Sequence, residues 1–458
     1  MKRYDVIWIG TGQATGTVVP RLVNAGKSVA IAEGGRFGGS CVNYGCTPTK
    51  TIVASARAAH MARRGADFGV ITGDISIDFA KVMERQNKIR NMGSNGMEKW
   101  LTGMDNVNVY KAFATFESAN TVRVGDEIIY GETIVINAGG RARTVSIPGI
   151  DGVDWLNNRG LLDLEELPPH LVIVGGSYIS MEFAQAFRRL GSEVTILEGS
   201  PQLMFREDAD IAAAAHEVLA GEGININLGA RVNRLSQEAP QQIDVFFEQD
   251  GEEKQVQGTH LLLAIGRVPN SDRLNLEAAG VEANKRGYIQ VNDVMQTNIP
   301  HIYAVGDING EGAFTHTSVN DGEIFWDHFS GEADRSLADR ITTYAMFIDP
   351  PLGRVGMSEK EARLSDRNVL MATRPMKYIS RAKEKDETAG LVKILVDADS
   401  EEFLGAAILG VGGDEIINMF TPFMYTKQSY KLFRRAILTH PTVAELMPWI
   451  LDDLKPLE

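Results

Sequence analysis

Cysteine is nearly absent from this chain, whose 458 residues include only Cys41 and Cys46. A disulfide framework of the kind that stabilises secreted domains is therefore excluded, and a reducing compartment such as the cytoplasm is expected. The eight histidines are scattered, and none combines with a cysteine at a spacing that suits zinc, so we expect no metal site.

Long apolar runs and an excess of positive charge are also missing. No stretch approaches the ~20 apolar residues that a membrane-spanning helix needs. The apolar run after Met1-Lys2-Arg3 covers only Val6 to Ile9, which is too short for the core of a signal peptide. The net charge of -14 argues against nucleic acid or an anionic membrane as the main partner. With 44% hydrophobic residues the chain can bury large cores, and its length predicts about three domains.

Both cysteines stand in one glycine-flanked stretch, Gly38-Gly39-Ser40-Cys41-Val42-Asn43-Tyr44-Gly45-Cys46-Thr47-Pro48-Thr49-Lys50. Residues five apart on an ideal helix lie roughly 8–9 Å apart at Cα, whereas a disulfide needs about 4.4–6.8 Å. A bond between Cys41 and Cys46 therefore requires a distorted turn, which Gly45 can supply because it lacks a Cβ. Such a bond is easily reduced, and its loop is too short to stabilise the fold much. We interpret the stretch as a redox-active pair rather than as two inert thiols on one helix face.

A dinucleotide-binding fingerprint precedes the cysteines. The apolar segment 4–9 predicts a buried parallel strand, and the glycine-rich segment 10–16 leads into a helical pattern. Gly10 permits a tight turn, and Gly12 lets backbone N–H groups approach a pyrophosphate at the N-terminus of the helix. A second strand ends in Glu33, 23 residues after Gly10, where a carboxylate can hold a ribose hydroxyl. Thr15 occupies the third fingerprint position, so either the helix packs more loosely on the strand or Gly16 takes over that duty.

The same unit occurs a second time. A strand at 171–174 runs into Gly175-Gly176-Ser177-Tyr178-Ile179-Ser180, followed by a helix and by a strand that ends in Glu198, again 23 residues after the first glycine. This duplication indicates two dinucleotide-binding domains. Ser177 replaces a glycine, where it crowds the phosphate slightly but can donate its hydroxyl. Glu198 accepts from a free 2′-hydroxyl and repels a 2′-phosphate, which favours NADH over NADPH.

The remaining segments predict further α/β structure and then a different C-terminal domain. Residues 51–105 are expected to be helical, and residues 107–136 to form strands with turns at 125–126 and 130–131. Asp307 follows a buried strand and a glycine, at the sheet edge where ligands bind. Beyond about residue 340 we expect an α+β domain, with strands and helices near 344–348, 392–397, 404–409, 414–427 and 430–437.

Two dinucleotide units, a CxxxxC pair, and a terminal His440-Pro441-Thr442 with Glu445 five residues after the histidine together resemble the pyridine nucleotide-disulfide oxidoreductases. The resemblance covers essentially the whole chain. It implies an α/β fold with two Rossmann-like dinucleotide-binding domains and a C-terminal α+β dimerisation domain, in a homodimer that binds FAD and NAD(P)H. The implied domains are 1–149 (FAD, first part), 150–266 (NAD(H)), 267–338 (FAD, second part) and 339–458 (dimerisation).

The resemblance also implies catalytic roles. Cys46 is expected to lie against the flavin and Cys41 to face the substrate. His440, donated across the dimer and oriented by Glu445, is expected to act as acid and base. The alternative is that His440 is an ordinary interface histidine.

Further implied roles concern the cofactors. Lys50 and Glu182 are expected to pair beside the flavin N5, with a plain buried salt bridge as the alternative. Asp307 is expected to hold the ribityl chain of FAD, and Tyr178 to cover the nicotinamide pocket. The other expected cofactor-binding positions are Gly10, Gly12, Gln13, Ala14, Glu33, Gly39, Ser40, Ala114, Ala138, Gly139, Gly175, Ser177, Ile179, Glu198 and Gly266.

Within the family, segments 381–390, 405–410 and 446–457 are most similar to mercuric-reductase-like oxidoreductases, a subgroup that includes flavoproteins of reactive-chlorine and metal stress. True mercuric reductase carries an extra C-terminal cysteine pair, which this chain lacks. We expect electrons to pass from NADH through FAD to Cys41–Cys46 and on to a small acceptor: a disulfide, a metal ion such as mercury or copper, a quinone or a reactive species. The alternatives are dihydrolipoamide dehydrogenase, glutathione reductase, and a flavin redox sensor without a substrate of its own.

Overall fold

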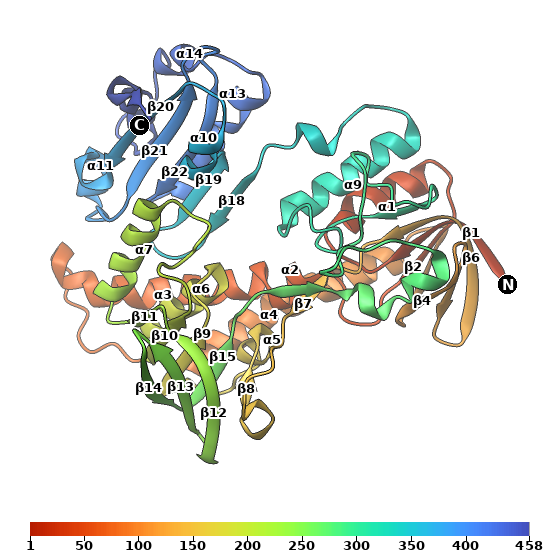
Figure 1. Cartoon of the computed structure of the whole chain (residues 1–458), viewed down its shortest axis with the longest axis horizontal. Coiled ribbons are helices and arrows are strands. Elements are labelled where there is room, and N and C mark those ends of the chain that lie inside the picture. Colours follow the sequence, from red (N-terminus) through yellow and green to blue (C-terminus); the bar gives the residue numbers. More distant parts are fainter. Residues whose placement is uncertain (458) are drawn as a thin grey trace. The chain divides into compact units, whose positions relative to one another are not determined.

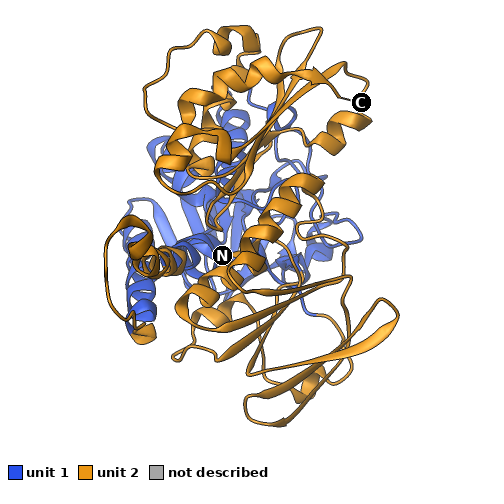
Figure 2. Cartoon of the chain, turned by 90° about the vertical axis from the view of Figure 1, so that its left-hand side faces the viewer, with its two compact units in different colours: residues 1–51, 81–144, 266–340 blue, residues 52–80, 145–265, 341–458 orange. Residues whose placement is uncertain are grey.

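The computed structural model describes residues 1–457 (Figure 1). These residues divide into two compact units (Figure 2). The first unit consists of residues 1–51, 81–144 and 266–340, and the second of residues 52–80, 145–265 and those from 341 onward. Each unit is therefore assembled from three separate segments of the chain. Across residues 1–457, no helix combines the length and the apolar character that crossing a bilayer requires.

A seven-stranded sheet forms the centre of the first unit. Its strands are, in order, β3 (Val107–Tyr110), β2 (Val29–Ala32), β1 (Lys2–Ile9), β6 (Glu127–Ile136), β5 (Thr121–Val124) and β4 (Ala114–Ser118), with β17 (Ile302–Ala304) also paired to β6. The pairs β3–β2, β2–β1, β1–β6 and β6–β17 are parallel, and the β1–β2 pair is the one that the fingerprint predicted.

The side chains of β1 alternate between two cores, as the period of two along a strand requires. Val6 and Trp8 pack with residues of helices α1 (Ala14–Asn24) and α9 (Thr315–Ser330). Ile7 and Ile9 belong to a separate core that includes Phe116 of β4. The apolar run that identified this strand is thus buried on both faces.

The turn expected at residues 130–131 is wrong, because β6 continues through both positions. Gly131 lies opposite Tyr4 of β1, and a Cβ there would stand 2.8 Å from Cγ1 of Ile7. This glycine lets two strands approach and does not reverse the chain. The turn at 125–126 is confirmed, with Gly125 at φ +60° between β5 and β6.

Residues 51–105 are largely helical, as expected. The helix α3 (Cys46–Arg63) continues into a 3₁₀ turn at 64–68, and α4 (Phe79–Thr102) follows. The segment 69–78 between them is not helical. It begins at Gly69, whose φ of +76° ends the 3₁₀ turn.

The second unit contains the repeated dinucleotide unit. Its parallel sheet has the order β11 (Asn225–Leu228), β10 (Glu193–Glu198), β9 (His170–Val174), β15 (His260–Leu263) and β8 (Trp155–Leu156). Helix α6 (Tyr178–Leu190) contacts β9 and β10. An antiparallel sheet of β12 (Arg231–Ala239), β13 (Gln242–Gln249) and β14 (Glu252–Gly258) was not predicted.

A six-stranded antiparallel sheet forms the C-terminal part of the second unit. Its order is β18 (Thr343–Met346), β19 (Leu352–Gly356), β22 (Phe403–Leu409), β21 (Leu391–Asp397), β20 (Val369–Pro375) and β23 (Lys455–Pro456). Short helices accompany it, including α10 (Glu359–Leu364), α13 (Thr421–Tyr425) and α14 (Tyr430–Arg434). Phe403 meets Phe420 and Phe433 edge-on in its core. The expected α/β class with a C-terminal α+β part is confirmed.

Candidate active site

A break between two helices brings the cysteine side chains together. The helix α2 (Gly39–Tyr44) ends at Gly45, whose φ of -136° and ψ of -115° are not helical, and α3 begins at Cys46. A Cβ on Gly45 would stand 3.1 Å from the carbonyl oxygen of Ser40, so the break favours glycine. The distorted turn expected at Gly45 is confirmed, and Cys41 and Cys46 are within hydrogen-bond reach of each other.

The two thiols lie in different environments. Cys41 is half-buried, and a hydrogen bond with Cys46, together with burial, raises the pKa of Cys41 well above that of an ordinary thiol. Cys46 is exposed, and the hydroxyl of Thr315 lies 3.7 Å from its sulfur. Thr315 is the first residue of α9, a helix end that favours negative charge. The exposed Cys46 thus lies beside a helix N-terminus, whereas the half-buried Cys41 is the thiol with the raised pKa.

Close backbone contacts hold the first glycine turn. Gly10 has a φ of +94°, and a Cβ there would come within 2.4 Å of the Asn137 carbonyl oxygen. A Cβ on Gly39 would stand 2.9 Å from Cα of Gly12, so the start of the cysteine helix lies against the fingerprint. Gln13 donates to the Gly38 carbonyl at 2.9 Å. The structure thus brings the predicted fingerprint residues and the cysteine stretch together within the first unit.

Thr15 has a function that the sequence did not reveal. Its buried hydroxyl accepts hydrogen bonds from Trp8 Nε1 at 2.9 Å and from Asn137 Nδ2 at 3.0 Å. These bonds link α1, β1 and the segment after β6, so the contact is not loose. A Cβ on Gly16 would meet no atom of a packed neighbour within 4 Å among residues 1–457, so the idea that Gly16 takes over the third glycine's duty is wrong.

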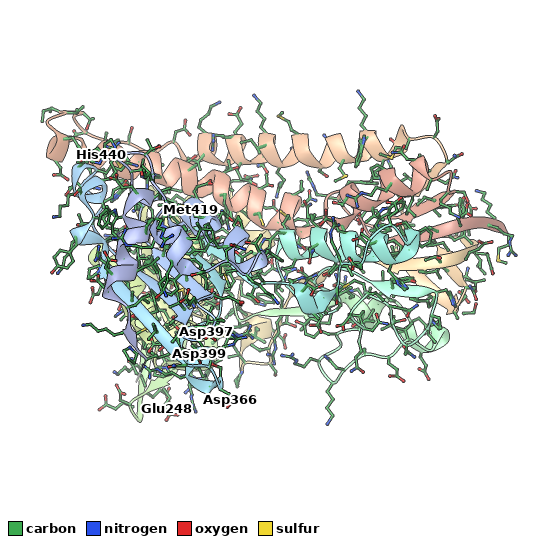
Figure 3. The ribbon with its side chains drawn as sticks, turned by 90° about the horizontal axis from the view of Figure 1, so that it is seen from above. Glu248, Asp366, Asp397, Asp399, Met419 and His440 are labelled. Carbon is green, nitrogen blue, oxygen red and sulfur yellow. The ribbon has the colours of Figure 1, made fainter. Side chains whose placement is uncertain are left out.

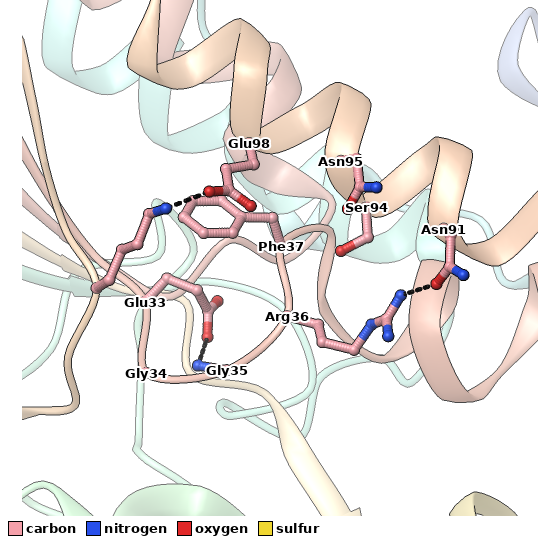
Figure 4. Close-up of a pocket in the computed structure, with 10 residues that line it drawn as sticks. Glu33, Gly34, Gly35, Arg36, Phe37, Asn91, Ser94, Asn95 and Glu98 are labelled. Carbon is pink, nitrogen blue, oxygen red and sulfur yellow. Dashed lines mark hydrogen bonds and ion pairs between the residues drawn. The ribbon is translucent and has the colours of Figure 1, made fainter. Parts of the chain in front are cut away.

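Glu33 lies just beyond β2, beside a polar cavity of about 440 Å³ (Figure 4). Its carboxylate accepts from the backbone N–H groups of Thr11 at 2.9 Å and Gly35 at 2.7 Å. The cavity is lined by Glu33, Gly34, Gly35, Arg36, Phe37, Asn91, Ser94, Asn95, Glu98 and Lys111. Helix α1 starts without a side-chain cap and without an acidic residue in its first turn, which leaves N–H groups for a phosphate. These features fit the adenosine and pyrophosphate portions of FAD.

Asp307 follows β17 and Gly306, at the carboxyl end of the sheet. Its carboxylate accepts from Arg267 Nη2 at 3.0 Å, and the same nitrogen donates to the Gly140 carbonyl at 2.8 Å. Ser40 Oγ lies 3.4 Å from this nitrogen. Arg267 was not among the predicted site residues, although an arginine directly after a strand and Gly266 was a usable signal. Three further predicted positions lie in this unit, Ala114 at the start of β4 and Ala138 and Gly139 just after β6.

The second glycine turn repeats the geometry of the first. Gly175 has a φ of +106°, and a Cβ there would lie 2.6 Å from the Ala264 carbonyl oxygen. Glu198 accepts from the N–H of Gly176 and, at 2.7 Å, from that of Ser200, as Glu33 does in the first turn. Ser177 is exposed at the start of α6, which again lacks a side-chain cap and an early acidic residue. The second turn therefore offers the same kind of phosphate and ribose site.

The remaining predicted residues of this region lie on helices. Tyr178 and Ile179 are the first two residues of α6, and Ile179 is exposed. Glu182 is buried on α6, where it accepts from the backbone N–H of Phe347 at 2.8 Å. Lys50 lies on α3.

His440 is labelled in Figure 3, in the C-terminal part of the chain. Its Nδ1 lies 3.0 and 3.1 Å from the two carboxylate oxygens of Glu445. The His440 side chain is 77% exposed, whereas that of Glu445 is 16% exposed. The pair therefore presents an oriented imidazole at the surface of its unit, with Nε2 available.

Comparisons with known proteins agree over nearly the whole chain. A family model described as pyridine nucleotide-disulphide oxidoreductase matches residues 4–322, and the dimerisation-domain model of the same family matches residues 342–451. The chain is 36% identical to the probable pyridine nucleotide-disulfide oxidoreductase RclA of Escherichia coli, covering 97% of this chain and 98% of RclA.

Solved structures and more distant relatives extend the comparison. The structure of RclA, described as an HOCl-induced flavoprotein disulfide reductase, superposes with a TM-score of 0.88 at 36% identity, covering 98% of this chain and 99% of that one. A Cu(II) complex of RclA gives a TM-score of 0.89 at 36% identity and covers 99% of both chains. A mercuric reductase of Lysinibacillus sphaericus is 30% identical over 90% of this chain and 76% of its own length. A dihydrolipoyl dehydrogenase of Bacillus subtilis is 31% identical over 96% of both proteins.

These matches agree with three features of the structure: two similar nucleotide turns, a closely spaced cysteine pair, and a C-terminal sheet with an oriented histidine. The family implies FAD and NAD(P)H as cofactors and a homodimer as the assembly. This chain belongs to the pyridine nucleotide-disulfide oxidoreductases, the NAD(P)H-dependent flavoenzymes that carry a C-terminal dimerisation domain.

Proposed function

We propose that this enzyme is an NADH-dependent disulfide reductase that passes electrons through Cys41 and Cys46 to a small acceptor, either a disulfide or copper(II). We assign FAD to residues 1–149 and 267–338, NADH to 150–266 and dimerisation to 339–458. The observation that carries the proposal is the break at Gly45, which brings two thiols of unlike environment together beside the N-terminus of α9.

The residues that would hold FAD are those of the first fingerprint, the cavity beside Glu33, and Asp307 with its partner Arg267. Bound there, FAD supplies transfer of an electron pair from the nicotinamide to the disulfide. Glu198 supports NADH as the donor, because its carboxylate already lies at the turn and would repel a 2′-phosphate. Lys50 and Glu182 are proposed to pair beside the flavin.

The dithiol chemistry follows from the environments of the two sulfurs. Two electrons and two protons convert the Cys41–Cys46 disulfide into two thiols. Cys41, after losing its proton, attacks one sulfur of an acceptor disulfide and releases the other as a thiol. Cys46 then attacks Cys41, which restores the internal disulfide and releases the second thiol. The high pKa of Cys41 means that a base must take its proton before it attacks.

We propose His440 as that base, contributed by the partner subunit. In support, its imidazole is exposed, is oriented by Glu445, and lies in the region that matches the dimerisation model. It would take the proton of Cys41 and return it to the departing thiol. The chain has only two cysteines and no disulfide framework, which supports a cytoplasmic location, where NADH is available.

Copper is the metal acceptor that we favour over mercury. RclA has been solved as a Cu(II) complex, and copper in its reduced state prefers thiolate ligands. Mercury delivery requires additional thiolates, and this chain contains no cysteine besides Cys41 and Cys46. Dihydrolipoamide oxidation is a second candidate function, favoured by Glu198 and by the Bacillus subtilis relative.

A screen of electron acceptors tests the proposal. Purified FAD-loaded protein is assayed with NADH and with small disulfides, copper(II), a quinone and, in the reverse direction, dihydrolipoamide with NAD⁺. We expect Cys41→Ser to abolish turnover of disulfides and copper(II) but to retain that of the quinone, which takes electrons directly from the flavin and serves as an internal control. Full retention of disulfide turnover in Cys41→Ser would refute the dithiol route, and a rate with dihydrolipoamide of ~10 s⁻¹ or more would favour the second candidate.

A further inference from the structure

Two tyrosines in the second unit donate to a single carboxylate oxygen. Tyr178 opens α6 directly after the second glycine turn, and Tyr344 lies on β18. The hydroxyl of Tyr178 donates to Oε1 of Glu207, and that of Tyr344 donates to the same atom at 2.5 Å. The two rings lie with their centroids 5.6 Å apart. The Glu207 side chain has no exposed surface, so its carboxylate depends on protein donors for its hydrogen bonds.

Glu207 is fixed in place independently of the tyrosines. Its other oxygen, Oε2, accepts from Arg354 Nε at 2.8 Å, and Arg354 also donates to Asp208 at 2.7 Å. The backbone of the same loop reaches the glycine turn, because the N–H of Met204 donates to the Gly176 carbonyl at 2.9 Å. Glu207 therefore offers a stationary acceptor next to the turn over which the dinucleotide is proposed to lie.

The phenol of Tyr178 stays protonated while it is bonded to Glu207, so it always donates this hydrogen bond. Burial, and then the negative charge of Glu207, raise the pKa of Tyr178 far above its ordinary value, and the same causes raise that of Tyr344. Both groups keep their protons throughout the physiological range. A carboxylate oxygen can accept two hydrogen bonds, so Oε1 has room for both tyrosine hydroxyls. With only one of them it still has a hydrogen-bond donor.

We propose that Glu207 and Tyr344 are positioning residues for Tyr178: the Glu207 carboxylate holds its phenol over the nicotinamide pocket, and Tyr344 lets that phenol leave at low cost. The inference rests on the proposed function, in which Tyr178 covers that pocket. When Tyr178 swings away to admit the nicotinamide, Tyr344 still donates to Oε1, and no buried carboxylate oxygen is left without a donor. Leaving a buried acceptor without any donor is more costly than exchanging one hydrogen bond. Tyr344 thus makes opening easier, whereas the bond from Tyr178 makes it harder.

A double-mutant cycle on NAD⁺ binding distinguishes this device from simple packing. The dissociation constant of NAD⁺ is measured by calorimetry on FAD-loaded wild type, Tyr178→Phe, Tyr344→Phe and the double variant. We expect Tyr344→Phe to weaken binding by about tenfold, since opening now leaves Oε1 bare. Tyr178→Phe should bind NAD⁺ severalfold more tightly. In the Tyr178→Phe background, removing the Tyr344 hydroxyl should change nothing, because no bond to Oε1 is broken on opening.

Kinetics provide a second readout. In Tyr344→Phe the KM for NADH should rise while kcat at saturating NADH stays at the wild-type value. A variant with a distorted domain would instead lose kcat as well. Should Tyr344→Phe fold poorly, Tyr178→Phe serves instead: it has no hydroxyl bond to Oε1 to break on opening, so it should bind NAD⁺ more tightly than wild type. An equal loss of affinity on removing the Tyr344 hydroxyl in both backgrounds, or unchanged affinity in Tyr344→Phe or Tyr178→Phe, overturns the inference. Failure of the proposed function is distinct, because wild type would then neither bind NAD⁺ nor be reduced by NADH.

Discussion

Replacing Arg354 with alanine tests the buried ion cluster that joins the second dinucleotide unit to the C-terminal sheet. Arg354 is 3% exposed, and its guanidinium donates at 2.8 Å to Glu207 and at 2.7 Å to Asp208, whose side chains are 0% and 1% exposed. Removing one partner of a buried pair leaves an uncompensated charge and costs about 3–5 kcal/mol. At about 2–4 °C per kcal/mol for a cooperative unit of 150–250 residues, we expect the calorimetric Tm to fall by about 6–20 °C.

The matched control is Arg363→Ala. Arg363 also pairs with a carboxylate, that of Glu359, but its side chain is 45% exposed. Such a surface pair contributes about 0–1 kcal/mol, so its loss should lower the Tm by no more than a few degrees. Equal shifts in the two variants, or an Arg354→Ala protein as stable as wild type, would show that the buried cluster does not stabilise this unit.

Three further predictions concern the cofactor, the acid–base residue and acid stability. Gly39→Ala should lower the FAD content of the purified protein, because φ is +64° at this position and the added Cβ would meet Gly12. The ratio of flavin to protein absorbance measures this content, and a full content would contradict the prediction. Glu445→Ala should slow disulfide turnover by about 10²-fold without altering flavin reduction by NADH in stopped flow, and unchanged turnover would argue against an oriented His440. Burial alone would raise the pKa of Asp208, but Arg354 and Lys393 hold it below its ordinary value of 3.8. The stability from this depressed pKa is present above about pH 4 and is lost as the pH falls further. Asp208→Asn should therefore have a lower free energy of unfolding at neutral pH, but should lose less of it on acidification. Urea titrations from neutral pH to about pH 3 can check both effects.

The duplicated nucleotide units were predictable from sequence because their signals are local. A strand, a glycine turn and an acid 23 residues later lie within one short segment, and both copies fold as expected, with Gly10 and Gly175 at positive φ. Gly45 was predictable for a similar reason, since the distance between two cysteines on a helix is fixed by helix geometry.

Contacts between residues far apart in the sequence were not predictable. Thr315 lies 269 residues from Cys46, and Asn137 lies 122 residues from Thr15, and neither carries a motif. Gly131 looked like a turn residue because glycine marks turns and strand contacts alike. Only the pairing of β6 with β1 distinguishes the two.

The unpredicted antiparallel sheet has a further cause. In β13 the successive residues Ile243, Asp244 and Val245 are all buried, so the alternation that marks a half-buried strand is missing. Asp244 tolerates burial because Gln255 and Gln257 of β14 donate to it at 2.6 and 3.0 Å. Such a pairing can be recognised only once the strands are aligned.

Counting thiols before and after anaerobic reduction tests the redox role of Cys41 and Cys46 most directly. Because the chain contains only these two cysteines, every thiol detected in the denatured protein comes from this pair. The oxidised FAD-loaded protein should show none, and the same protein treated with NADH should show two per chain, with the flavin as intermediary. A thiol count that does not change on treatment with NADH, in protein whose flavin is reduced, would contradict the account.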